Sequence, residues 1–197
     1  DRKPVLAICV GMQALMSRSE ENGGVACLDV LPGQVAFFGE AHQSDDGERL
    51  KVPHMGWNAV QPVIDHPLWR GIEPDTRFYF VHSYHVVPDN QAVTAGTFDY
   101  GLTGCAALAQ ENLFATQFHP EKNIFEQGEA AGGGPYEEIA HSRSAVAASQ
   151  YMANFFVEQA RASTHRFASD PWPQLIYGHT TTTDDAPEFI QIYSFPK

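Results

Sequence analysis

The sequence predicts an α/β domain, and three observations lead to this fold class. Residues 4–8 form an apolar run typical of a buried strand, and Met12, Leu15 and Met16 follow it directly at helical spacing. Several further strand-like runs occur before residue 119. Residues 144–163 then carry apolar side chains on one face of a long helix. Strands and helices in one short chain therefore indicate an α/β fold.

In chain order, the first helix is expected to be short, because residues 17–24 form a polar stretch rich in glycine at its end. Pro32-Gly33 is typical of a turn before a strand, residues 41–48 are expected to form a charged hairpin loop, and Asp99-Tyr100-Gly101 a turn. Strands are predicted over residues 34–38, 51–60, 77–81, 91–95, 104–108 and 113–118. The strands that lead up to residues 113–118 are expected to be antiparallel.

The C-terminal part begins with a small-residue loop, residues 130–134, before the long helix. Two strand-like runs, residues 175–177 and 189–195, follow the helix and flank a Thr-rich loop. The apolar face of the helix is predicted to consist of Val146, Met152, Phe155, Phe156 and Ala160.

Length and charge limit the possible functions. The 197 residues are enough for a sizeable core, so residues 1–197 are predicted to form a single domain. The net charge of −12, with only 12 Lys and Arg, argues against nucleic acid or an anionic membrane surface as a partner, since both need a basic footprint. No run of about 18 apolar residues predicts a membrane span.

Three cysteines, Cys9, Cys27 and Cys105, are a sparse set without a C-x-x-C pair. This usage fits a reducing, cytoplasmic compartment better than a disulfide framework. Cys27 and Cys105 are interpreted as structural, whereas Cys9 stands where the first strand meets the first helix. A side chain at such a turn projects above the sheet, and the amides of the following helix favour a thiolate. A lone cysteine at a strand end is nevertheless more often a packed core residue.

The decisive pattern lies downstream, where another apolar strand ends at His119-Pro120-Glu121. His119 is suited to take the proton of Cys9, and Glu121 to hold the imidazole in one orientation, as in a catalytic triad. Cys9, His119 and Glu121 are therefore the predicted catalytic residues. The backbone N–H of Val10 is expected to hold an oxyanion, and the small residues Ala7 and Gly11 to permit a tight elbow.

The paired motifs G-x-C-x-G-M-Q and Q-F-H-P-E-K resemble the class I, triad-type glutamine amidotransferases. Residues 1–122 resemble, more narrowly, the glutaminase subunit of imidazole glycerol phosphate synthase, through residues 19–21, 31–33, 52–58 and 80–84. The resemblance implies a three-layer, flavodoxin-like fold. Members of that family have a strand, a helix and a Gly-rich loop before the nucleophile strand. The chain is therefore expected to lack these N-terminal strands, together with the second oxyanion donor that the loop supplies, and to be a fragment.

The resemblance also implies residues that bind glutamine. Gln13, on the first turn of the helix, is expected to lie beside the substrate together with the backbone of Val10 and Gly11. His82, Ser83 and Tyr84 follow a strand and are suited to grip the α-amino and α-carboxylate groups. The alternative is that Gln13 is a solvated helix residue and that the His-Ser-Tyr sequence is hydrogen-bonded only to neighbouring backbone.

A further implication concerns a partner. In the synthase family, the segment that corresponds to residues 52–58 faces the cyclase subunit, a (β/α)8 barrel that consumes the ammonia. His54, Met55, Trp57 and Asn58 are therefore expected at such an interface, although composition alone favours a core segment. No cofactor is expected, and no metal, because His54, His66, His85, His141, His165 and His179 have no companions at metal-ligand spacing.

From His119 onward the resemblance changes to γ-glutamyl hydrolase, through H-P-E-K-N-x-F-E, residues 151–157, Ala160-Arg161 and residues 191–195. That family shares the fold and the Cys-His-Glu chemistry but cleaves poly-γ-glutamate from folates. The preferred prediction is a glutaminase that supplies ammonia in histidine biosynthesis, with the hydrolase as the alternative. A third possibility is an inactive remnant that only binds a partner, favoured by the missing N-terminal loop and by Ala7, where the family prefers Gly.

Overall fold

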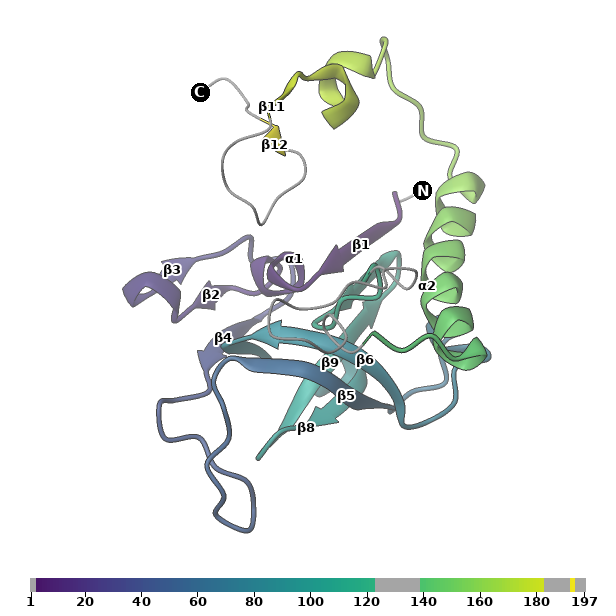
Figure 1. The fold of residues 1–197 in the computed structure, drawn as a ribbon. Coiled ribbons are helices and arrows are strands. Elements are labelled where there is room, and N and C mark those ends of the chain that lie inside the picture. The colour runs from purple at the N-terminus through teal and green to yellow at the C-terminus, as the bar shows by residue number, and fades with distance from the viewer. Residues whose placement is uncertain (1–2, 123–138, 183–191, 194–197) are drawn as a thin grey trace. The chain divides into compact units, whose positions relative to one another are not determined.

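The computed structural model of the chain describes residues 3–122, 139–182 and 192–193 (Figure 1). The predicted loop 130–134 and most of the predicted strand 189–195 lie outside these residues. The sequence predicts one domain, whereas the chain forms two compact units, Asp1–Ser163 and Thr164–Lys197. Every residue of the predicted site belongs to the first unit.

The first unit is built on a six-stranded sheet. The outermost pair, β1 and β10, is parallel, and all other neighbours in the sheet are antiparallel. The antiparallel pattern predicted for the middle of the chain is therefore confirmed. The strands lie in the order β1 (Val5–Ile8), β10 (Leu113–Thr116), β9 (Thr103–Gln110), β8 (Thr94–Asp99), β5 (His54–Pro62) and β6 (Thr76–His82).

A second sheet of four strands, which the sequence does not predict as a separate sheet, contains the predicted strand near residue 34. Gly33 begins that strand, and a Cβ at Gly33 would lie 2.7 Å from the carbonyl oxygen of Val87 on the neighbouring strand. Glycine is therefore required by this close backbone approach. The strands lie in the order β3 (Val25–Ala26), β2 (Arg18–Ser19), β4 (Gly33–Phe37) and β7 (Tyr84–Pro88).

Both predicted helices are present. The first, α1 (Val10–Ala14), is short, as expected. The second, α2 (Arg143–Ala162), begins at Ser142, whose hydroxyl accepts a hydrogen bond from the N–H of Ala145. Met152 and Phe155 are buried as predicted, but Ala160 is exposed, because the helix packs on the sheet only over its earlier turns.

The main sheet is covered on both faces, as alternate residues of β10 make clear. Phe114 belongs to an apolar cluster with Met152 and Phe155 of α2, whereas Leu113 and Ala115 pack in a second cluster. The second cluster contains α1 and the four-stranded sheet through Met12, Leu15, Met16, Leu31, Val35 and Val86. Burial on both faces fixes the position of β10 and of the residues that follow it.

One predicted strand is wrong in part and another is wrong. The first three residues of the predicted strand 91–95 form a 3₁₀ turn, η3 (Gln91–Val93), because the Asn90 side chain accepts from the N–H of Ala92 and caps the turn, whereas residues 94 and 95 begin β8. In the predicted strand 175–177, residues 176 and 177 lie in the 3₁₀ turn η6 (Ile176–Gly178), and residue 175 joins it to η5 (Trp172–Gln174), in the second unit. The remaining short elements are η1 (Glu21–Gly23), η2 (Pro67–Trp69), β11 (Thr181–Thr182) and β12 (Ile192–Tyr193).

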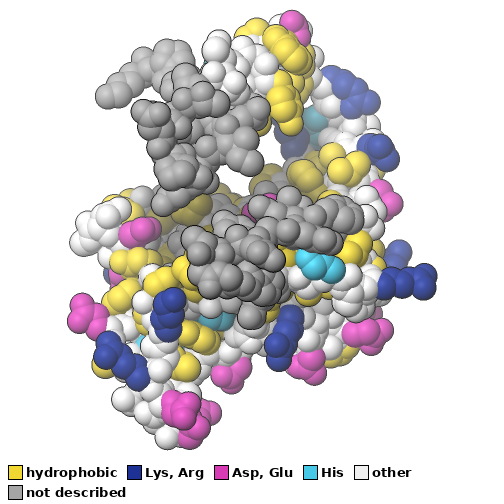
Figure 2. Space-filling view, in the orientation of Figure 1, with side chains coloured by type: hydrophobic (Ala, Val, Ile, Leu, Met, Phe, Trp, Pro, Cys, Tyr) yellow, Lys and Arg dark blue, Asp and Glu magenta, His cyan; other side chains and the backbone are white. Residues whose placement is uncertain are grey.

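No helix among the described residues is both long and apolar enough to cross a membrane. The face shown in Figure 2 carries acidic and basic side chains interspersed with hydrophobic ones.

Candidate active site

Parallel pairing of β1 with β10 brings the predicted catalytic residues to one edge of the sheet. The register pairs Ile8 with Thr116, so both strands end at the same level. Cys9 is the next residue on one chain segment, and its N–H donates to the carbonyl oxygen of Thr116 at 2.7 Å. His119 follows only three residues after Thr116. The two halves of the predicted triad therefore meet, although 110 positions separate them in the sequence.

Cys9 occupies a strained elbow. Its backbone has φ 51° and ψ −111°, a conformation that residues other than glycine rarely adopt. The carbonyl of Cys9 accepts from the N–H of Gln13, so the helix begins directly after the nucleophile. A Cβ at Gly11 would lie 3.5 Å from the Cβ of Ala7, which is ordinary contact. The backbone strain therefore lies at Cys9 itself, where the sequence predicts the elbow. A side chain at position 11 would fit without a clash, so crowding at Gly11 is not the cause of the strain.

His119 is held by its backbone and by Glu121. The N–H of His119 donates to the carbonyl of Tyr79 in β6 at 2.9 Å. Its side chain bonds through Nδ1 to Oε1 of Glu121 at 2.7 Å. This is the orientation expected of a triad, with Nε2 left to face the nucleophile.

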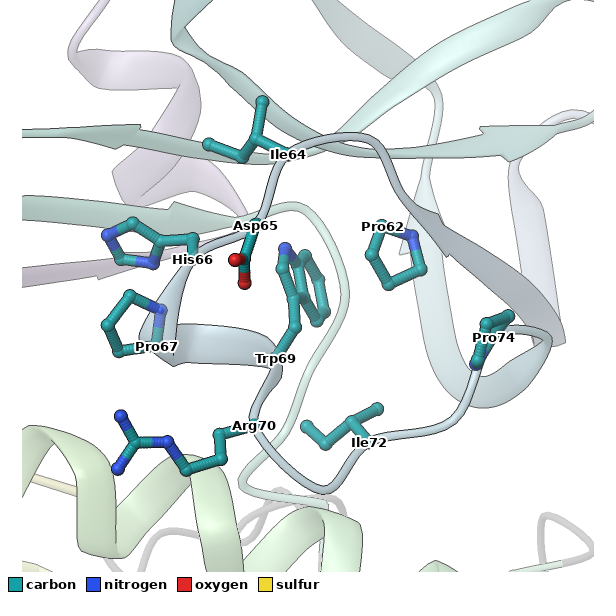
Figure 3. Close-up of a pocket in the computed structure, with 9 residues that line it drawn as sticks. All are labelled: Pro62, Ile64, Asp65, His66, Pro67, Trp69, Arg70, Ile72 and Pro74. Atoms are coloured by element: carbon teal, nitrogen blue, oxygen red, sulfur yellow. The ribbon is translucent and has the colours of Figure 1, made fainter.

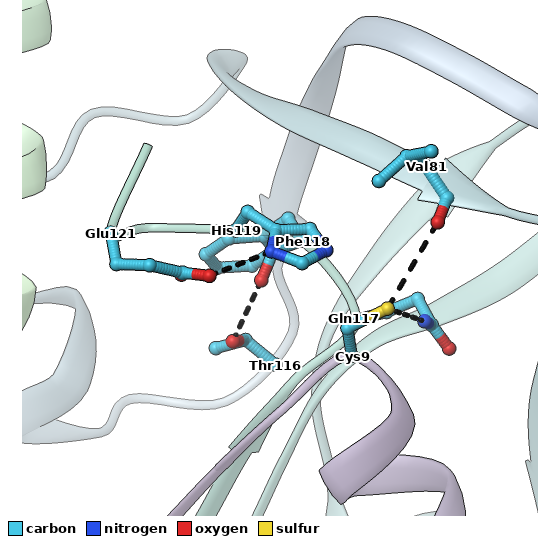
Figure 4. A network of polar contacts seen from close by, with 7 residues as sticks. All are labelled: Cys9, Val81, Thr116, Gln117, Phe118, His119 and Glu121. Carbon is cyan, nitrogen blue, oxygen red and sulfur yellow. Dashed lines mark hydrogen bonds and ion pairs between the residues drawn. The ribbon is translucent and has the colours of Figure 1, made fainter. Parts of the chain in front are cut away.

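The pKa of His119 is raised to about 9, first by the thiol of Cys9 and then by the hydrogen bond to Glu121, while burial opposes both. Yet His119 Nε2 is buried and makes no hydrogen bond by distance and angle. The thiol and the imidazole are therefore close neighbours without a hydrogen bond between them. Figure 4 shows Nε2 on the side of the ring away from Glu121. Although burial opposes it, the bond to His119 lowers the pKa of Glu121.

The sulfur of Cys9 has two further polar neighbours (Figure 4). It lies 4.0 Å from the carbonyl oxygen of Val81 in β6, and Nε2 of Gln117 donates to it at 3.7 Å. Gln117 is fully buried. Gln117 is not among the site residues predicted from the sequence, although a glutamine in an otherwise apolar segment near His119 is a usable signal.

The predicted substrate-binding residues are placed differently from one another. Gln13 is buried, and its Nε2 donates to the carbonyl of Tyr84 at 3.0 Å and to Oε1 of Gln117 at 3.3 Å. His82 is also buried, with Nδ1 bonded to the carbonyl of Tyr84 at 2.7 Å. Both nitrogens of His82 are used inside the protein, so the alternative interpretation, bonding to neighbouring backbone, describes its side chain. Ser83 is half-buried.

The segment expected at a partner interface, residues 52–58, also contains both accessible and buried side chains. Met55 is 48% exposed, and Trp57 and Asn58 are half-buried. His54 is only 3% exposed and stacks on Phe80 and Tyr100. The expectation that His54 contacts a partner is therefore wrong for its side chain, because alternate residues of β5 point into the core.

His54 is tied to His82 and Asn58. Nδ1 of His54 lies 3.0 Å from Nε2 of His82, and Nδ2 of Asn58 lies 3.2 Å from Nε2 of His54. Burial, followed by the charge of the neighbouring imidazole, lowers the pKa of His54 to about 3. Burial likewise lowers the pKa of His82 to about 4. Both imidazoles are therefore neutral at pH 7.

The other thiols are in different surroundings. Cys105 is buried, and burial raises its pKa to about 12, which makes it a poor nucleophile. Cys27 is half-buried in the loop after β3. Among the residues that the structure describes, no three His, Cys, Asp or Glu side chains are grouped so that they could hold a metal ion.

Two hollows lie in the surface of the first unit. One, of about 520 Å³, is lined mainly by prolines and apolar residues around Trp69, with Asp65, His66 and Arg70 (Figure 3). The other, of about 500 Å³, includes Ser83 and the cations Arg49 and Lys51. Neither is lined by Cys9, His119 or Glu121.

The family model for glutamine amidotransferase class-I matches residues 1–133. The chain belongs to this family. The resemblance stated from the two motifs is thereby confirmed, and the α/β fold is that of a class-I glutamine amidotransferase. The match also ends near the point where the sequence changes its resemblance.

Relatives within this glutamine amidotransferase family identify a narrower group. Proteins described as imidazole glycerol phosphate synthase subunit HisH are 56% identical over 121 residues in Pseudomonas syringae and 57% identical over 122 residues in Acinetobacter baylyi. Subunit HisH 1 of Pseudomonas aeruginosa is 55% identical over 122 residues. These alignments cover 61% of this chain and 56 or 57% of each relative. The chain therefore spans little more than half the length of the relatives it matches.

Proposed function

We propose that the protein is a glutaminase that hydrolyses glutamine to glutamate and ammonia. The observation that carries this proposal is the meeting of the Cys9 elbow with the His119–Glu121 pair at the ends of two parallel strands, in a chain of the class-I glutamine amidotransferase family. The strained elbow supports a nucleophile in preference to a packed core cysteine, the main alternative for a lone thiol.

The arrangement supports the following reaction. The thiolate of Cys9 attacks the γ-carbonyl carbon of glutamine, and the N–H of Val10 stabilises the oxyanion that forms. The imidazolium of His119, held by Glu121, gives its proton to the leaving nitrogen. The C–N bond then breaks, and ammonia departs. The neutral imidazole then takes a proton from water, which attacks the thioester. Glutamate leaves, and sulfur and imidazole return to their starting state.

The relatives extend the proposal to a partner. Their name, subunit of imidazole glycerol phosphate synthase, together with the family resemblance, supports a role in which the ammonia passes to a (β/α)8 cyclase subunit in histidine biosynthesis. The sparse cysteines support a cytoplasmic location. Met55, Trp57 and Asn58 are the proposed contacts, and His54 supports them from the core. Glutamine itself is proposed to bind at Gln13, Ser83 and Tyr84 and at the backbone of Val10 and Gly11.

The γ-glutamyl hydrolase alternative depends on residues 119–197, most of which lie beyond the family match at residue 133. Residues 151–157 and 160–161, on which part of this resemblance relies, belong to α2, beyond that match. We therefore propose glutaminase activity first, in a three-layer domain, and treat polyglutamate cleavage as an outcome of the test.

One preparation of the full chain tests the proposal. Glutamate release from glutamine is measured with and without the cyclase barrel and its ligand, beside release of glutamate from pteroyl-polyglutamate. We expect glutamine turnover that rises with the barrel and is abolished by Cys9→Ala. Polyglutamate cleavage that ignores the barrel would contradict the proposal, and so would activity on neither substrate.

A further inference from the structure

We propose that Gln117 takes part in catalysis by donating an N–H to the sulfur of Cys9, and that Gln13 is a positioning residue that fixes the direction of this bond. The proposal rests on the glutaminase function proposed above and concerns the same site. Its starting observation is a fully buried amide, Gln117, whose Nε2 lies 3.7 Å from the Cys9 sulfur.

The orientation of the Gln117 amide decides its effect on the sulfur. An N–H directed at the sulfur favours a thiolate, whereas a carbonyl oxygen in the same place would repel one. Oxygen and nitrogen of an amide must be told apart from their hydrogen-bond partners. The neighbours of Gln117 therefore have to determine which end faces Cys9.

The carbonyl of Tyr84 supplies this determination, because a backbone carbonyl can only accept. It lies 3.0 Å from Nε2 of Gln13, so the NH₂ group of Gln13 must face it. The second hydrogen of that NH₂ group is directed at Oε1 of Gln117, at 3.3 Å. Turning Gln117 around would place two NH₂ groups against each other. Turning Gln13 as well would place its oxygen against the Tyr84 carbonyl. Gln117 is thereby held with its N–H toward Cys9.

The same carbonyl is fixed from its other side by a chain of neutral histidines. Because it can only accept, Nδ1 of His82 must donate to it, which leaves Nε2 of His82 as an acceptor. His54 must then donate from Nδ1 and accept at Nε2 from Asn58. Nδ2 of Asn58 also donates to the carbonyl of Asp99 at 2.7 Å, so its direction is set as well.

These hydrogen bonds are compatible with one direction of donation only. It runs from Asn58 in β5 through His54 and His82 to the carbonyl of Tyr84, and from Gln13, which donates to the same carbonyl, through Gln117 to the nucleophile. Directed hydrogen bonds between buried groups make such a network rigid. The residues around the sulfur therefore present a preorganised donor, as stabilisation of a developing or resting negative charge requires.

The test measures alkylation of Cys9 by iodoacetamide as a function of pH in the full chain, with the modified peptides mapped. Gln117→Met keeps the volume and removes the donor. We expect a rate at pH 7 about 10-fold lower and a midpoint of the pH profile about one unit higher, the size of one hydrogen bond to a charged group. Gln110→Met, at an exposed position in β9, is the matched control and should leave the alkylation profile of Cys9 unchanged. Alkylation of Cys27 in the same samples is the internal control, and its rate should be the same in all variants.

Gln13→Met provides a second variant, which does not touch the sulfur and gives the test if Gln117→Met does not fold. We expect it to shift the profile in the same direction, and the double variant to shift no further than Gln117→Met alone, since Gln13 acts through Gln117. Unchanged Cys9 profiles in folded variants, or additive losses, would overturn the proposal. Alkylation needs no glutamine turnover, so a shifted profile without glutaminase activity would reject the proposed function and retain the network.

Discussion

The buried histidine pair makes stability sensitive to mild acid. His54 and His82 are hydrogen-bonded to each other as neutral rings. Protonating His82 would oppose two donors across this 3.0 Å contact, and protonating His54 would oppose two donors across its 3.2 Å contact with Asn58. The charges that act on the pair are other imidazoles, those of His42, His85 and His119. We therefore expect that lowering the pH from 7 to 5 destabilises the first unit, well above the range in which carboxylates titrate.

The magnitude follows from the pKa values. The folded values of about 3 and about 4 lie below the unfolded value of 6.5, so between these limits the unfolded chain binds more protons. The stabilising contribution is complete above pH 6.5 and is lost as the pH falls. From pH 7 to 5 each ring contributes a loss of about 2 kcal/mol in the free energy of unfolding. His119, whose pKa is raised to about 9, offsets about 1 kcal/mol. For these three groups together the net loss is about 3 kcal/mol, a large share of a typical 5–15 kcal/mol. Burial also lowers the pKa of His66 and of His85, which adds to the loss.

The assay is urea unfolding of the full chain at pH 7 and pH 5, with the double variant His54→Asn, His82→Gln. These amides keep hydrogen-bonding groups but do not titrate, so the variant should lose about 3 to 4 kcal/mol of the pH dependence. His141→Gln, which replaces an exposed histidine, is the control and should behave as the wild type. An equal loss of stability in the double variant and the wild type would refute the reasoning.

Two further changes test the site. Glu121→Gln removes the carboxylate that helps to raise the pKa of His119, so glutamine turnover should fall about 10²- to 10⁴-fold. The alkaline limb of the pH profile of turnover should also move to lower pH. An unchanged limb would show that Glu121 does not act on His119. Trp57→Ala should weaken cyclase binding by about 2 kcal/mol or more, measured by calorimetry, without changing Cys9 alkylation. Val63→Ala, at an exposed apolar residue outside residues 52–58, should change neither cyclase binding nor Cys9 alkylation. Equal effects of the two variants on binding would argue against this docking segment.

The predicted triad could be located from the sequence because Cys9 directly follows one strand and His119 lies three residues after the end of another. Cys9 ends one apolar run and His119 follows another, so strand boundaries alone bring chemistry to a sheet edge. The long helix was predictable from its spacing of apolar residues, and Ser142 marks its start. Local patterns of this kind survive folding because the same residues form both the element and its buried face.

Other features depend on contacts that a sequence pattern does not contain. β7 follows β6 after a single residue, Ser83, so the two look like one continuous run, and the change of sheet is decided by pairing with β4. At Gln91 a side-chain cap from Asn90 overrides strand propensity. His54 and His82 look like surface polar residues until their pairing across β5 and β6 is known. That Gln117 contacts the sulfur of Cys9 becomes clear only from the register that pairs β1 with β10.

The most direct test of the central claim, that Cys9 is the nucleophile of a glutamine site, is labelling with a glutamine-like electrophile followed by peptide mapping. We expect modification of Cys9, slowed by added glutamine and greatly reduced in His119→Asn, while Cys27 and Cys105 stay unmodified. Modification chiefly at Cys27 or Cys105, or labelling of Cys9 that glutamine does not slow, would contradict the account.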